Sequence, residues 1–250
     1  MSKIKLMSHL VAGYPTDEIA FEAASAMVRG GADILEIQFA FSDPSADGQA
    51  IQGACTEVLS RGYRVADGLR FISKVHEAFP ETTIYLMSYG SLVYTPGVEN
   101  FCRRASEAGV RGMIIPDLPF DHDEGLSRAC EKFGMKNIPV ASPSMSEERL
   151  FKMAHAGFPA IYASLRVGIT GDSTVIDKDT LEFISKVKSG GAKVYGGFGI
   201  SNGEQSKALA GSVDAVVAGS VFVRLITANA ADQKALAFAV ESKARELCGL

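Results

Sequence analysis

Gly30-Gly31-Ala32-Asp33-Ile34-Leu35-Glu36-Ile37 joins the expected end of a helix to the expected start of a strand. Glycine just past the last helical turn readily takes the left-handed conformation that ends a helix. The apolar residues that follow are continuous rather than alternating, which is typical of a strand covered on both faces. The same joint recurs before later apolar runs, at Ala108-Gly109-Val110, Ala156-Gly157, Gly190-Gly191 and Ala210-Gly211. The chain is therefore predicted to repeat a β/α unit.

Eight short apolar runs, separated by segments of helical period, predict an α/β fold, a closed (β/α)8 TIM barrel. The predicted strands are Leu6–Val11, Asp33–Phe39, Thr83–Tyr89, Gly112–Pro116, Ile138–Ala141, Ala160–Ser164, Lys193–Gly197 and Ala215–Gly219. We expect a single domain over residues 1–250, because this length suits such a barrel and no linker interrupts the chain. An open doubly wound sheet is the alternative, but no G-x-G-x-x-G follows the first strand. Residues 232–250 are expected to form a final outer helix.

The composition argues against several classes of function. The residues are 47% hydrophobic and 22% charged, the net charge is −4, and no Lys/Arg run occurs, so nucleic acid and anionic membranes are poor partners. No apolar run approaches the roughly 20 residues of a membrane span, and the start lacks a signal-peptide pattern. Four scattered cysteines without a C-x-x-C pair indicate free thiols in a reducing cytosol, and four scattered histidines predict no metal site. We expect a cytoplasmic protein.

Carboxylates gather behind the second predicted strand. Glu36 lies within the apolar run, where a lone charge is costly unless it is paired, protonated or used. Asp43 and Asp47 follow on a loop rich in Pro, Gly and Asp, which can fold back over the carboxyl end of the strand. Catalytic groups of (β/α)8 barrels lie at this end, so Glu36 and a loop aspartate are expected to share one site and divide acid and base roles.

Glycine loops close the seventh and eighth predicted strands. Gly197-Phe198-Gly199 and Gly219-Ser220 stand where barrel enzymes often bind phosphate on backbone N–H groups. Gly171, on the loop after the sixth strand, is a third candidate donor. Because these two short loops carry no Lys or Arg, backbone dipoles would supply most of the recognition. Ser201 and Glu204 form a capping-box pattern that predicts a helix start.

Taken together, these residues resemble the tryptophan synthase alpha chain family over nearly the whole chain. The matching segments are Ala12-Gly13-Tyr14-Pro15, Phe41-Ser42-Asp43-Pro44 with Ala46-Asp47-Gly48, Pro116-Asp117-Leu118-Pro119, Arg166-Val167-Gly168-Ile169-Thr170-Gly171 and Gly197-Phe198-Gly199-Ile200-Ser201. The resemblance implies a lyase of tryptophan biosynthesis, which cleaves indole-3-glycerol phosphate by a retro-aldol reaction to indole and glyceraldehyde 3-phosphate.

The same resemblance assigns roles by position. Glu36 matches the catalytic glutamate, and Asp47 matches the catalytic aspartate that holds the indole N–H. Tyr162 matches an active-site tyrosine, and Thr170 matches a loop threonine that closes onto the aspartate. The positions that match the phosphate site are Gly171, Phe198, Gly199, Gly219 and Ser220. Asp43 is interpreted as a residue for loop shape or partner contact.

The resemblance also implies a partner, a tryptophan synthase beta chain in an α2β2 complex that receives the indole. Pyridoxal phosphate is expected only in that beta chain, and no cofactor or metal in this one. Two alternatives stay open: another phosphate-binding barrel enzyme of sugar-phosphate or indole metabolism, and a non-catalytic activator of the beta chain. Loops 40–49 and 166–176 are expected to be mobile without ligand, because they are long and rich in glycine or polar residues.

Several positions depart from the family pattern. Gln38 stands where Gly is usual and His9 where an aromatic residue is usual, and we expect His9 to be a satisfied core histidine. The other departures are Ala40, Ser45, Gln49 and Ser91. Most of the differences are expected in or near the surface that meets the beta chain, and none removes a proposed catalytic group. How the barrel floor is capped is left open by the sequence.

Overall fold

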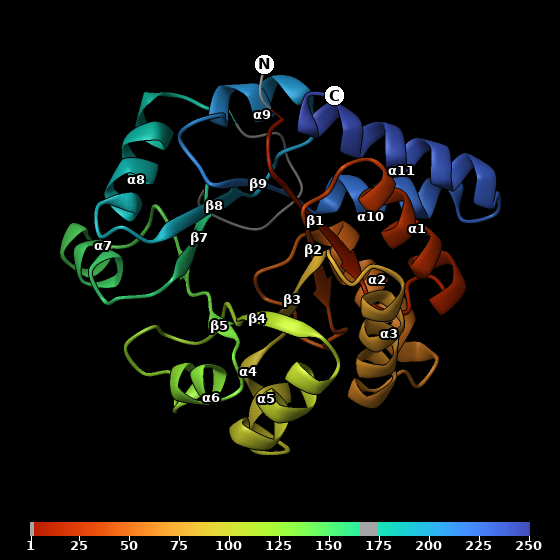
Figure 1. Cartoon of the computed structure of the whole chain (residues 1–250), viewed down its shortest axis with the longest axis horizontal. Coiled ribbons are helices and arrows are strands. Elements are labelled where there is room, and N and C mark those ends of the chain that lie inside the picture. Colours follow the sequence, from red (N-terminus) through yellow and green to blue (C-terminus); the bar gives the residue numbers. More distant parts are fainter. Residues whose placement is uncertain (1–2, 166–174) are drawn as a thin grey trace.

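The strands form a ring with helices outside it, as the computed structural model, which describes residues 3–165 and 175–250, shows in Figure 1. Every strand pairing is parallel, and the strands follow the order β5-β4-β3-β2-β1-β9-β8-β7-β6. The strands are β1 Leu6–Val11, β2 Ile34–Gln38, β3 Thr83–Met87, β4 Val110–Ile114, β5 Lys136–Asn137, β6 Val140–Ala141, β7 Ala160–Ser164, β8 Lys193–Gly197 and β9 Ala215–Ala218. The predicted (β/α)8 barrel is confirmed.

The wall of the barrel closes through a broken strand. The prediction of one continuous strand over Ile138–Ala141 was wrong, because β5 pairs only with β4, and β6 pairs only with β7. Between them, the Ile138 N–H donates to the Met113 carbonyl at 2.9 Å, and the Pro139 carbonyl accepts from the Tyr162 N–H at 2.9 Å. Proline has no N–H to give to a ladder, so the chain passes from one neighbour to the other at this point.

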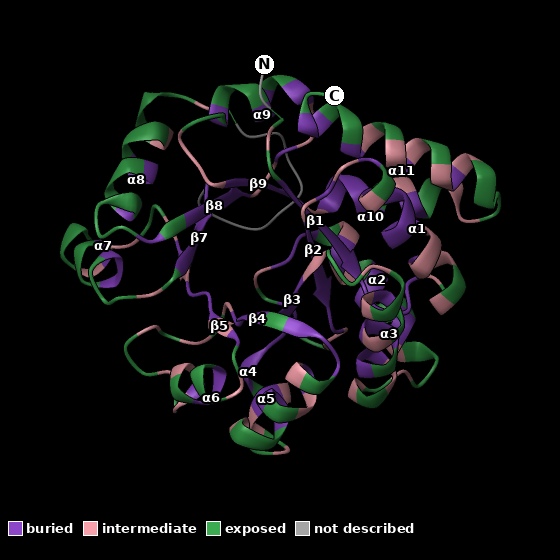
Figure 2. Ribbon diagram, viewed as in Figure 1, coloured by how far each residue is buried: buried purple, intermediate pink, exposed green. Residues whose placement is uncertain are grey.

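The helices cover the outside of the ring. They are α1 Asp17–Arg29, α2 Gln49–Ser60, α3 Val65–Ala78, α4 Gly90–Tyr94, α5 Val98–Glu107, α6 Leu126–Lys132, α7 Glu147–Ala154, α8 Lys178–Lys188, α9 Gly203–Leu209, α10 Ser220–Asn229 and α11 Gln233–Cys248. Figure 2 shows mostly buried strands and helices with one buried and one exposed side. The predicted outer helix at the end of the chain is α11, which packs against α1 and α10.

The glycine joints have the predicted backbone conformation. Gly109 ends α5 with φ +104°, and a Cβ at this position would lie 2.4 Å from Cγ of His76. The capping box, by contrast, lies one residue later than predicted. Asn202 caps α9, and its partner is Gln205 rather than Glu204. The Gln205 side chain accepts from the Asn202 N–H at 3.2 Å, while the Asn202 side chain accepts from the Gln205 N–H at 3.0 Å.

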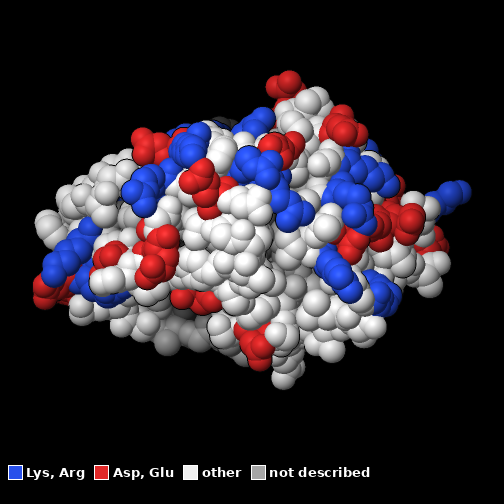
Figure 3. Space-filling view, turned by 90° about the horizontal axis from the view of Figure 1, so that it is seen from below, with Lys and Arg blue, Asp and Glu red and all other residues white. Residues whose placement is uncertain are grey.

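Among the described residues, no helix is long and apolar enough to cross a membrane. On the face shown in Figure 3, basic and acidic side chains are intermixed. The pairing of β1 with β2 places His9 opposite Glu36, and Val11 opposite Gln38. This register brings the polar residues of two neighbouring strands to the same end of the barrel.

Candidate active site

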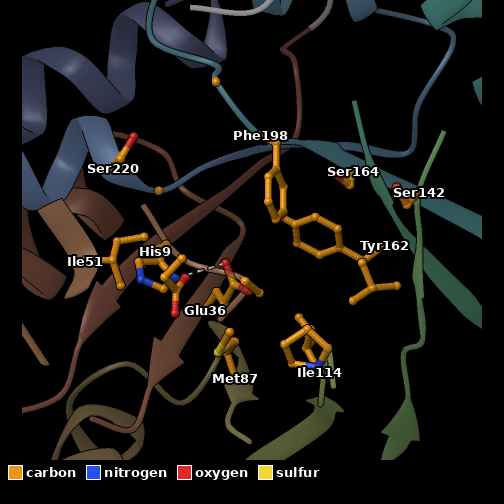
Figure 4. Close-up of a pocket in the computed structure, with 16 residues that line it drawn as sticks. His9, Glu36, Ile51, Met87, Ile114, Ser142, Tyr162, Ser164, Phe198 and Ser220 are labelled. Atoms are coloured by element: carbon orange, nitrogen blue, oxygen red, sulfur yellow. Dashed lines mark hydrogen bonds and ion pairs between the residues drawn. The ribbon is translucent and has the colours of Figure 1, made fainter. Parts of the chain in front are cut away.

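A pocket opens at the carboxyl ends of the strands, where the barrel rule predicts chemistry (Figure 4). It encloses about 890 Å³ of space, including its open mouth. Its lining includes these predicted site residues: Glu36, Asp47, Tyr162, Phe198, Gly199, Gly219 and Ser220. The other two, Thr170 and Gly171, lie outside the described residues.

Glu36 is buried on β2 with 4% of its surface exposed. Its partner is His9 of β1, whose Nδ1 lies 3.2 Å from Oε2 of Glu36. A carboxylate can only accept, so Nδ1 carries the hydrogen of this bond. His9 Nε2 is buried and has no hydrogen-bond partner in the described part of the chain. The expectation of a satisfied core histidine was therefore wrong, because His9 lines the pocket and is bonded on one side only.

Asp47 is buried at the end of the loop after β2, with 3% of its surface exposed. Gln38 Nε2 and the Tyr89 hydroxyl both donate to its Oδ2, each at 2.7 Å. Burial raises the pKa of Asp47, although the charge of His9 and these two hydrogen bonds oppose the rise. No described residue donates to Oδ1, so this oxygen is available to a ligand.

Tyr89 fixes the loop that carries Asp47. Its ring stacks on Phe41 with centroids 4.9 Å apart, and its hydroxyl accepts from the Ala46 N–H at 3.2 Å. The N-cap of α2 is Gly48, without a side-chain cap, so Asp47 does not serve as a helix cap. Its side chain is thereby left for the pocket.

One wall of the pocket is aromatic. Tyr162 of β7 and Phe198 after β8 meet edge to face, with centroids 5.8 Å apart. Phe198 has φ +83°, a conformation that is costly for a bulky residue and that is found where function constrains the backbone. Gly197 makes room for the tyrosine, because a Cβ there would lie 2.8 Å from the Tyr162 hydroxyl and 2.6 Å from Cβ of Val217.

The opposite end of the pocket is formed by Gly199, on the loop after β8, and by Gly219 and Ser220 at the start of α10. The N-cap of α10, Gly219, has no side chain to cap the helix, and no side chain of the described residues accepts from its first N–H groups. The neighbouring α9 differs, because Asn202 and Glu246 already accept from its first turn. Of these two helix starts, that of α10 is the better suited to an anion, because its N–H groups and the helix dipole favour negative charge.

Three residues of this site were not predicted as site residues from the sequence. Gln38 was expected near a partner surface, but it is fully buried and bonded to Asp47. His9 was expected in the core, and Tyr89 was not considered. Tyr89 had a usable signal, since it follows β3 at the same edge of the barrel as Asp47. The exposed departures are Ser45, Gln49 and Ser91, and Ala40 is half-buried.

The described residues contain no group of three or more His, Cys, Asp or Glu side chains arranged to hold a metal ion. The described lining of the pocket also lacks Lys and Arg.

The fold and this pocket define a (β/α)8-barrel protein with two buried carboxylates and an uncapped helix start in one pocket. The family model described as tryptophan synthase alpha chain matches residues 1–248. The chain belongs to the tryptophan synthase alpha chain family. Curated relatives with that name include those of Helicobacter hepaticus, 38% identical over 90% of this chain and 86% of the relative, and Methanosarcina acetivorans, 37% identical over 97% and 86%.

Solved structures agree with this assignment. One, described as the structural basis of mutual activation of the tryptophan synthase α2β2 complex from Pyrococcus furiosus, superposes with a TM-score of 0.88 and 28% identity, and covers 100% of both chains. The tryptophan synthase of Mycobacterium tuberculosis superposes with a TM-score of 0.87 and 29% identity, over 99% of this chain and 92% of that one.

Proposed function

We propose that this chain cleaves indole-3-glycerol phosphate to indole and glyceraldehyde 3-phosphate, as the alpha subunit of a tryptophan synthase. One observation carries the proposal: two buried carboxylates, Glu36 and Asp47, line one pocket at the carboxyl edge of the barrel. Each is held through one oxygen, so each can offer its other oxygen to a ligand.

Glu36 transfers the protons in this scheme. A proton added to C3 of the indole makes the carbon–carbon bond breakable and leaves positive charge on the ring nitrogen. Removal of the hydroxyl proton from the glycerol chain then forms the aldehyde, and the electrons of the broken bond return to the ring. One carboxyl group can give the first proton and take the second, which restores its starting state. General acid–base help of this kind contributes about 10²–10⁴-fold.

Asp47 stabilises the positive charge on the ring nitrogen and accepts its N–H on Oδ1. Tyr89 and Gln38 keep Oδ2 in place, so the carboxylate does not have to reorganise during the reaction. The indole ring lies against Tyr162 and Phe198, which supply an apolar wall. Thr170 is proposed to close onto Asp47.

The phosphate is proposed to bind at the uncapped start of α10, with Gly199, Gly219 and Ser220 as its described neighbours. Gly171 would add a backbone donor, and Phe198 would hold the loop between the two ends of the substrate. The site contains no basic side chain among the described residues, so the binding rests on backbone N–H groups and the Ser220 hydroxyl.

The partner is proposed to be a tryptophan synthase beta chain in an α2β2 complex, which takes the indole and holds the pyridoxal phosphate. The support is family membership and the likeness to the Pyrococcus furiosus structure. Asp43, exposed on the loop after β2, is proposed to contact this partner. We also propose a single domain and a cytoplasmic location, in keeping with the four free, buried cysteines.

Release of indole from indole-3-glycerol phosphate, with and without the beta chain, tests the proposal. Glu36→Gln and Asp47→Asn are each expected to lower kcat by about 10²–10⁴-fold. Glu81→Gln is the matched control, because Glu81 is exposed and does not line the pocket, and this variant is expected to keep the wild-type rate. Equal indole release by wild type and Glu36→Gln contradicts the catalytic assignment. If neither the wild type nor any variant releases indole, while Glu36→Gln still activates the beta chain fully, the chain is an activator instead.

A further inference from the structure

Two carboxylates are buried side by side in this pocket without an obvious source of positive charge. Glu36 and Asp47 expose only 4% and 3% of their surface. The described lining residues include neither Lys nor Arg, and His9 is the one side chain among them that can become a cation. Buried charges of one sign repel strongly and are stable only when they are paired or neutralised.

His9 is placed to balance both carboxylates. It is 3% exposed, β1 sets it opposite Glu36, and its Nδ1 is bonded to Oε2 of Glu36 at 3.2 Å (Figure 4). Burial by itself lowers the pKa of His9. The hydrogen bond to Glu36 and the charges of Glu36 and Asp47 outweigh burial, so the pKa of His9 is raised above its usual 6.5.

We propose that His9 is a positioning residue for the acid–base step, one that orients Glu36 and shares a single proton with it. The inference rests on the proposed function, and goes beyond it in making the acid–base group a His9–Glu36 pair rather than a single carboxyl. Neither the neutral nor the charged imidazole finds a described partner for the buried Nε2. A buried nitrogen without a hydrogen-bond partner lowers the stability of the fold, which is consistent with a functional role for His9.

The shared proton moves without a change in total charge. With the proton on Nδ1, His9 is an imidazolium and Glu36 a carboxylate that can accept the hydroxyl proton of the substrate. When the N–H bond breaks and an O–H bond forms on Oε2, His9 becomes a neutral imidazole that keeps its Nε2 hydrogen. Glu36 is then a carboxylic acid, and rotation of its carboxyl group turns this O–H from His9 toward the ligand, so that the proton passes to C3. Loss of this proton to solvent at high pH stops the cycle.

The titratable groups around His9 come from three elements. Glu36 on β2 and Asp47 on the following loop act on His9 directly, and Tyr162 of β7 lines the same pocket. Burial and the two carboxylate charges raise the pKa of Tyr162 well above its usual value, so this hydroxyl stays neutral. With the Tyr162 hydroxyl neutral, His9 is the group of this set that can supply positive charge to the two carboxylates.

Histidine titration by NMR tests the pairing without any reference to activity. The chain has four histidines, and selective ¹⁵N labelling follows the ring nitrogens of each. In Glu36→Gln the pKa of His9 is expected to fall by about 1–3 units, because an opposite charge is lost and burial remains. His122, whose side chain is 80% exposed, is the internal control and keeps its titration. An unchanged His9 titration overturns the proposal, even if indole release has confirmed the reaction.

The pH dependence of kcat/KM for indole release tests the role in catalysis. His9→Asn keeps an N–H donor for Glu36 but cannot carry the charge, and His9→Phe removes both. The alkaline limb of the profile is expected to shift by about one pH unit or more to lower pH in both variants. His9→Phe should also lose about 10-fold more rate than His9→Asn, since only His9→Asn still orients Glu36.

His122→Asn is the matched surface control and keeps the wild-type profile. If the alkaline limb of the profile does not move in His9→Asn and only KM changes, His9 merely fills space in the pocket. This result overturns the proposal. Absence of indole release from the wild-type complex overturns the proposed function, while the NMR titration still decides whether the pair exists.

Discussion

Asp47 is restrained through a single oxygen, and this is the most consequential detail at the scale of the residue. Tyr89 and Gln38 both donate to Oδ2 at 2.7 Å. Because a carboxylate has two oxygens, this arrangement fixes the direction of the free one. The geometry thus makes the donors, and not only the carboxylate, part of the site proposed for the indole nitrogen.

Tyr89→Phe should therefore lower kcat/KM for indole release by about 10- to 100-fold, which corresponds to a lost hydrogen bond to a charged group. The ring still stacks on Phe41, so the loop keeps its apolar contact. Tyr85→Phe is the matched control, because the Tyr85 hydroxyl bonds Tyr195, 3.0 Å away, and not a carboxylate of the site. Equal losses in both variants would mean that the Tyr89 hydroxyl has no special role.

The burial of Asp47 also predicts that its replacement raises the stability of the protein and lowers its activity. Burial, the largest cause, raises its pKa in the folded protein, so the ionised form is disfavoured by folding. This cost is present above the folded pKa and is absent below the unfolded value of about 3.9. Asp47→Asn should thus raise Tm at pH 7, by about 2–4 °C for each kcal/mol regained, while indole release is lost.

Thermal scans from pH 7 to pH 4 check the sign of this effect. The gain in Tm of Asp47→Asn over wild type should shrink as the pH falls, because Asp47 becomes protonated and the cost of burying its charge disappears. A variant that is less stable than wild type throughout the range would show that the hydrogen bonds of Asp47 outweigh its burial.

The sequence predicted the residue types of the site better than their neighbours. Glu36 and Asp47 were found from an apolar run and a turn-rich loop. His9 and Gln38 were misjudged because their partners depend on the β1–β2 register and on how the loop folds back. The strand register and the path of the loop cannot be deduced from one sequence, whereas the apolar character of a strand can. The roles of the site residues stay predictions.

At the scale of the element, two neighbouring helix starts serve different purposes. Asn202 and Gln205 satisfy the start of α9, while the start of α10 has no side-chain cap. A capped start stabilises its helix, whereas an uncapped start next to a pocket can bind an anion. The sequence pattern placed the capping box at Ser201 because Ser and Glu at that spacing imitate the true pair one residue later.

Asn202→Ala should cost about 1 kcal/mol of stability, because it removes the cap of α9. In a protein of this size the loss lowers Tm by about 2–4 °C. KM for indole-3-glycerol phosphate should not change, since the phosphate is assigned to α10. Ser220→Ala is the companion variant, for which a raised KM with little change in Tm is expected. A raised KM in Asn202→Ala would move the phosphate toward α9.

At the scale of the whole molecule, the residues that stabilise the barrel and the residues of the candidate active site lie at opposite ends of the strands. The glycine joints that end the helices lie before the strands, and the pocket lies beyond the carboxyl ends of the strands. The even repeat of apolar runs was enough to predict this arrangement. The break in the fifth strand was not predictable, because Lys136–Asn137 has no apolar run and pairs only through its backbone.

That break has a consequence for how the ring opens. Only two residue pairs join β4 to β5 and two join β6 to β7, while five join β1 to β2. Amide hydrogen exchange should therefore be faster over Lys136–Ala141 than over β1 and β2, since local opening breaks the fewest ladder bonds there. Equal protection in all strands would argue against this. Val140 lines the pocket, so each local opening of this segment would also weaken the contacts with a bound indole ring. The rate of product release would then depend on how often the β5–β6 segment opens.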